Sequence, residues 1–96
     1  MLVLPSELTH EQATNCSRML GQAIRSEAGP EVLADASALD RFDSSALAVL
    51  LECRREAMVA GKRLAVTGWP PKLRELAGLY GVLELLAPAD APTPAA

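Results

Sequence analysis

Short apolar runs alternate with helix-periodic segments along this chain, and this alternation constrains its fold more than any other feature. The expected strands are residues 2–4, 31–36 and 63–67, with a further short strand at 82–86. Three helices are expected. The first starts near Thr9, the second runs from about Ser44 to Ala60 and ends before Gly61, and the third follows Pro70-Pro71 and ends at Gly81. Residues 37–42 are expected to form a loop. Because strands that alternate with helices are joined by right-handed crossovers, we predict an α/β domain with about three helices on a mostly parallel or mixed sheet.

The size and charge of the chain restrict the class of protein. Its 96 residues are enough for one small domain, which we expect to occupy residues 1–86, before a Pro/Ala-rich, disordered tail at 87–96. A net charge of −3 argues against nucleic-acid binding. The chain has no apolar run of membrane-spanning length and no signal-peptide pattern at its start, so we expect a cytoplasmic protein without a membrane span.

The start of the second helix is the most informative local segment. Asp43 is placed to cap the helix, and Ser44 and Ser45 fall in its first turn, where unpaired N–H groups favour a phosphate. A helical projection predicts that an apolar stripe faces inward and that a partly apolar, low-relief face points outward. This outward face consists of Ser44, Ala48, Glu52, Arg55 and Val59. It is typical of a protein-docking face, although an alanine-rich chain could also produce it by chance.

No set of residues suggests catalysis. The chain lacks a nucleophile elbow and a glycine-rich phosphate loop, and its single histidine, His10, lies far in sequence from the serines. Capping and turn roles suit Asp35, Asp40 and Asp43 better than a Mg²⁺ site. We expect the two cysteines to be small buried residues rather than a disulfide or metal pair. The sequence therefore predicts a binding module, not an enzyme, with no catalytic residue, metal or cofactor.

The middle of the chain resembles the STAS domain family, which includes sulfate-transporter and anti-sigma-factor-antagonist domains. The resemblance rests on residues 32–37, 42–51 and 61–66, and it extends over about 7–86. It implies a STAS-like small mixed sheet with about three helices packed against it. STAS domains normally open with two strands before the first helix, whereas this chain has room for residues 2–4 alone. We therefore expect a shortened N-terminal part whose exposed sheet edge allows homodimer formation.

Within that family, the residues look closer to the small B subunit of the Mla phospholipid-transport ABC complex. The run Asp-Ser-Ser-Ala-Leu-Ala-Val-Leu-Leu and the Leu-Tyr-Gly-Val ending of the last helix carry this similarity. It implies a partner, the cytoplasmic ATPase subunit of the transporter, and a location peripheral to the inner membrane. The implied regulatory contact is at Ser44. The partner-binding residues that we expect are Asp43, Ser44, Ala48, Glu52 and Arg55.

The anti-sigma-factor-antagonist branch is the alternative. There the corresponding motif carries a hydroxyl that a partner-switching kinase phosphorylates, and by position this hydroxyl would be that of Ser45. The chain has Ala46 where that branch usually has glycine, and it lacks the additional C-terminal helix that is common there. On this alternative the partner is an anti-sigma-factor kinase.

Overall fold

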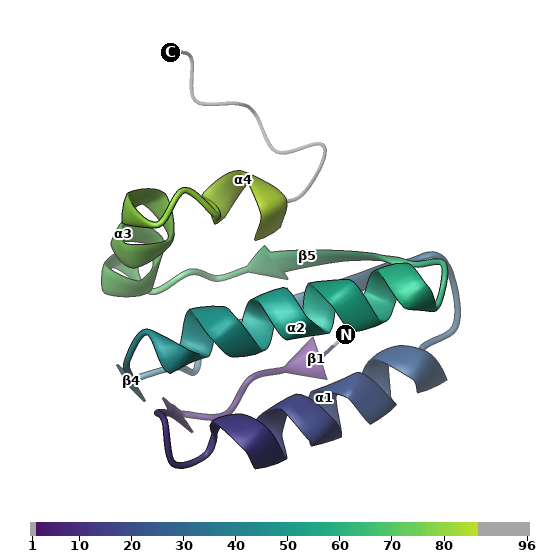
Figure 1. The fold of residues 1–96 in the computed structure, drawn as a ribbon, viewed down its shortest axis with the longest axis horizontal. Coiled ribbons are helices and arrows are strands. Elements are labelled where there is room, and N and C mark those ends of the chain that lie inside the picture. The colour runs from purple at the N-terminus through teal and green to yellow at the C-terminus, as the bar shows by residue number, and fades with distance from the viewer. Residues whose placement is uncertain (1, 87–96) are drawn as a thin grey trace.

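A computed structural model describes residues 2–86 of the chain (Figure 1). Two long helices alternate along the chain with short strands, and two shorter helices follow. The elements are β1 (Leu2–Val3), β2 (Glu7–Leu8), α1 (Ala13–Ser26), β3 (Glu31–Asp35), β4 (Arg41–Phe42), α2 (Ser45–Val59), β5 (Arg63–Thr67), α3 (Pro71–Leu79) and α4 (Leu83–Leu86). The α/β class predicted from the alternation is confirmed.

The strands form two small parallel sheets. In the larger one the order is β1-β3-β5, with Leu33 of β3 in register with Ala65 of β5. In the smaller one β2 pairs with β4, so that Leu8 lies opposite Phe42. Every strand pair in residues 2–86 is parallel, as crossover connections through α1 and α2 require.

Both long helices pack on the same side of the larger sheet, where they contact each other along their length (Figure 1). The side chains between the layers are aliphatic, and Ile24, Val32, Leu50 and Val66 are fully buried. The end of α1 is held by Lys62, whose ammonium group donates to the carbonyl oxygens of Ile24, at 2.8 Å, and Glu27. Cations at a helix C-terminus stabilise its unpaired carbonyls, so Lys62 fixes α1 against the turn that leads into β5.

Four expectations about individual elements are wrong. Two strands, β1 and β2, precede α1, whereas residues 2–4 alone were expected there; β2 has only two residues and is identified by its pairing with β4. The predicted loop at 37–42 contains β4, whose two residues are too few to show any periodicity. The predicted strand at 82–86 is instead the single turn α4, because Leu83 and Leu86, three residues apart, both turn toward the core. The first helix begins at Ala13 rather than near Thr9.

One of the two hydrogen bonds of the capping box expected at Thr9 is formed, and it lies in a turn before α1. The Thr9 N–H donates to Gln12 Oε1 at 2.9 Å, and the Gln12 N–H donates to the Thr9 carbonyl at 3.1 Å. The predicted disordered tail at 87–96 lies outside the described residues. In residues 2–86 no helix combines the length and hydropathy needed to cross a membrane.

Candidate docking surface

The first turn of α2 is organised by the carboxylate of Asp43. Its Oδ1 accepts the N–H of Ser45 at 2.8 Å, and its Oδ2 accepts the backbone N–H of His10 at 3.1 Å. These bonds, the one from His10 first, hold the pKa of Asp43 below its usual range, so the carboxylate is ionised at neutral pH. The Asp43 carboxylate thus binds an N–H group at the start of α2 as predicted, while the N-cap position itself is occupied by Ser44. The second bond of the carboxylate also joins the start of α2 to the turn that precedes α1.

The outward face of α2 is exposed as the projection predicts. Ser44, Ala48 and Arg55 are exposed, Glu52 is half-buried, and Val59 is 84% exposed. Glu52 and Arg55 form a surface ion pair at 3.6 Å. Ser45 is half-buried, so the two adjacent serines have different surroundings. The assignment of these residues to a partner contact stays a prediction.

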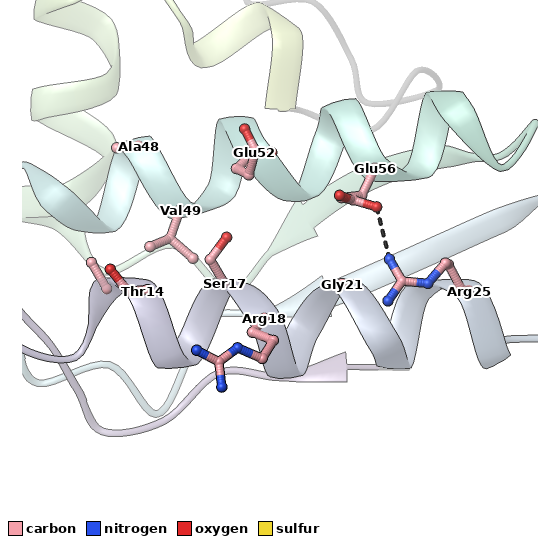
Figure 2. A pocket seen from close by; sticks show the side chains of 10 residues that line it. Thr14, Ser17, Arg18, Gly21, Arg25, Ala48, Val49, Glu52 and Glu56 are labelled. Atoms are coloured by element: carbon pink, nitrogen blue, oxygen red, sulfur yellow. Dashed lines mark hydrogen bonds and ion pairs between the residues drawn. The ribbon is translucent and has the colours of Figure 1, made fainter.

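A groove of about 520 Å³ lies between α1 and α2 and adjoins that face (Figure 2). Ala48 and Glu52 belong to its lining, whereas Asp43, Ser44 and Arg55 are outside it. Its walls are Ala13, Thr14, Ser17, Arg18, Gly21 and Arg25 from α1, and Ala48, Val49, Glu52 and Glu56 from α2. The arginines come from α1 and the glutamates from α2, so the two walls carry opposite charge.

Small side chains on α1 leave the groove open. Ala13, Ser17 and Gly21 are spaced four residues apart, and such residues lie one above another on a helix face. Arg25, the next residue in this row, donates to Glu56 Oε2 at 2.9 Å across the groove (Figure 2). An exposed pair of this kind contributes little to stability. It does define one end of the groove.

Sequence reasoning missed the contribution of α1. The row of small residues at four-residue spacing was visible in the sequence, but the packing of α1 beside α2 was not. We use the name docking surface for the outward face of α2 together with this groove.

Asp35 and the two cysteines have structural roles. Asp35 Oδ1 accepts the N–H of Ser37 at 2.9 Å, which keeps the pKa of Asp35 below its usual range. Both cysteines, Cys16 and Cys53, are buried and free, and burial raises the pKa of Cys53 to about 12. Such a thiol is protonated and unreactive at neutral pH. In residues 2–86 no cluster of three His, Cys, Asp or Glu side chains could hold a metal ion.

Comparison with known proteins agrees with the architecture. A family model described as "Mlab, STAS domain" matches residues 1–87. No curated protein matches the chain significantly.

Proposed function

This chain belongs to the STAS domain family, and on that premise we propose that it is a non-enzymatic accessory subunit that binds the cytoplasmic ATPase of a phospholipid-trafficking ABC transporter. STAS domains generally act as binding modules. The proposal places the protein in the cytoplasm, peripheral to the inner membrane through the transporter, where it would support lipid asymmetry of the outer membrane.

The observation that carries the proposal is the character of the docking surface. Its centre is small or apolar, with Ala48 on the outward face and Gly21 on the groove floor, and charged groups such as Arg18 and Glu56 lie around it. Protein interfaces share this arrangement, in which a desolvated centre carries the binding energy and a polar rim provides specificity. The exposed Val59 is a second apolar position on the same face of α2, beyond the Glu52–Arg55 ion pair.

Co-purification with the ATPase subunit tests this function. The wild-type chain should retain the ATPase, while Ala48→Glu and Ser44→Arg should lose it, because each adds a charged side chain to a low-relief face. Glu75→Arg, at an exposed position of α3, is the control and should retain the ATPase. Normal assembly and ATPase activity with both docking-surface variants would refute the proposal.

Partner switching by an anti-sigma-factor antagonist is the second candidate, favoured by the surroundings of Ser45. Its N–H donates to the Asp43 carboxylate at 2.8 Å, so its hydroxyl lies in the first turn of α2 next to this carboxylate. A phosphate on Ser45 adds a charge of about −1.5 to −2 at the start of α2, which would repel an acidic partner surface.

Phosphorylation experiments distinguish the two candidates. If the chain is an anti-sigma-factor antagonist, mass spectrometry after incubation with candidate anti-sigma kinases should find phosphate on Ser45. In addition, Ser45→Asp and Ser45→Ala should differ in their affinity for the partner. Equal binding of both variants to every candidate kinase would rule it out.

A further inference from the structure

The side of the β1-β3-β5 sheet that faces away from α1 and α2 carries exposed side chains. Along β3 and β5, Val32, Ala34, Leu64 and Val66 face the helices and are buried. On the opposite side Val3 is 66% and Leu33 39% exposed, and Ala65 is half-buried. The molecule measures only 19 Å along its shortest axis, as expected for one helix layer on one sheet. Parallel sheets are normally covered on both faces, so this uncovered face points to a partner.

The register of the strands gives this outer face a self-complementary pattern. Leu33 lies beside Ala65, a large residue next to a small one, and Glu31 lies beside Arg63, an acid next to a base. A two-fold axis that runs parallel to the strands, between β3 and β5, places β3 of each copy over β5 of the other. The facing residues are then at the same level along the strands. Leu33 then meets Ala65 of the second copy, and Glu31 meets Arg63 of the second copy, each contact occurring twice.

We propose that the outer face of the β1-β3-β5 sheet binds a second copy of this chain through that symmetric, face-to-face contact. Charge fixes the position of the axis, because an axis along β3 itself would bring Glu31 against Glu31. The contact also differs from the pairing of sheet edges expected from the sequence, which would involve only the two residues of β1. The docking surface belongs to the helix layer on the other side, so both surfaces can be occupied at once.

The contact is small and therefore weak. With the axis between β3 and β5, these two strands face the second copy and β1 extends beyond the contact. Two strands of five residues span about 16 Å by about 10 Å, and this area is well below the roughly 800 Å² per partner of a standard stable interface. Self-association should accordingly appear only at high concentration. Sedimentation velocity and amide NMR spectra, recorded from about 10 µM to about 1 mM chain, provide the measurement.

The expected result is a rise in sedimentation coefficient with concentration, accompanied by amide shifts at Leu33, Ala65 and their neighbours on the outer face. A chain that stays monomeric at about 1 mM overturns the proposal. Concentration-dependent shifts confined to the outer edge of β1, or to the groove between α1 and α2, overturn it as well, because they would identify a different interface.

Charge reversal supplies the specific test. Glu31→Arg and Arg63→Glu should each weaken self-association by about tenfold or more, since each brings like charges together twice. The double variant should restore it, because the opposite charges meet again. Arg74→Glu, on the exposed side of α3, is the matched control and should change nothing. Circular dichroism verifies that each variant is folded. If a charge variant unfolds, Leu33→Thr replaces it in the test; this variant keeps a strand-forming residue and should weaken self-association. Unchanged association of the folded variants would contradict the proposal.

Discussion

Gly68 follows β5 directly, where the chain passes close to the end of β3. Its φ is +67°, and a Cβ atom built there would lie 2.7 Å from Asp35 Oδ1 and 3.0 Å from the backbone nitrogen of Ser37. Gly81 has a similar φ of +71° but nothing within 4 Å of such a Cβ. The two positions therefore separate the cost of backbone strain from the cost of a steric clash.

We expect Gly68→Ala to destabilise the protein more than Gly81→Ala. The left-handed conformation alone costs a non-glycine residue about 1–2 kcal/mol, which is the loss expected at Gly81. At Gly68 the clash with the Asp35–Ser37 turn adds to it, for a total of about 3 kcal/mol or more. Urea denaturation measures the free energy of unfolding of both variants. Equal losses would mean that the turn moves aside without cost.

Asp43 makes stability depend on pH in the acidic range. Its folded-state pKa is lowered, so its bonds to His10 and Ser45 contribute fully above the unfolded value of about 3.9. That contribution is lost as the pH falls through the lower folded-state value. Asp43→Asn should thus melt a few degrees below the wild type at pH 7, and the difference should shrink below about pH 4. A difference that stays constant from pH 7 to pH 2 would show that ionisation of Asp43 does not matter.

At the scale of an element, α1 keeps a helix-destabilising glycine on the floor of the groove. A Cβ atom at Gly21 would make ordinary contacts, at 3.6 Å to Arg25 Nη1 and 3.8 Å to Glu56 Cγ, so alanine fits there. Gly21→Ala should raise the free energy of unfolding by about 0.5–1 kcal/mol, because alanine favours the helix.

The same substitution should weaken binding of the ATPase, since the added methyl group narrows the groove. Gly78→Ala in α3, where a Cβ meets nothing within 4 Å, is the control that should leave binding unchanged. Denaturation of both variants measures their stability, and binding titrations measure their affinity for the ATPase, so that the two effects are measured separately. A Gly21→Ala variant that gains stability and binds as tightly as the wild type would mean that the partner does not enter the groove.

The elements that could be predicted from the sequence are those whose signal is local. The helix from about Ser44 to Ala60 and the strands at 31–36 and 63–67 have clear periodicity, and the structure places α2, β3 and β5 there within one residue. The outward face of α2 follows from the same periodicity. The β2–β4 pair and the α1 wall of the groove could not be predicted, because each depends on which distant segments meet in the fold.

At the scale of the whole molecule, the two layers present two surfaces of different kinds. The helix layer carries the docking surface, with its oppositely charged walls, and the sheet layer carries the outer face around Leu33. A third exposed apolar site, at Leu79 and Tyr80, lies at the end of α3 and is separate from the docking surface. It provides a reference position for testing which surface the ATPase contacts.

Site-specific photo-cross-linking tests the central claim most directly. A benzophenone side chain placed at Ser17 or Ala48 should form a covalent adduct with the transporter ATPase in the purified complex, whereas the same probe at Leu79 should form none. Adducts from Leu79 alone, or equal yields from all three positions, would contradict the assignment of the docking surface to α1 and α2.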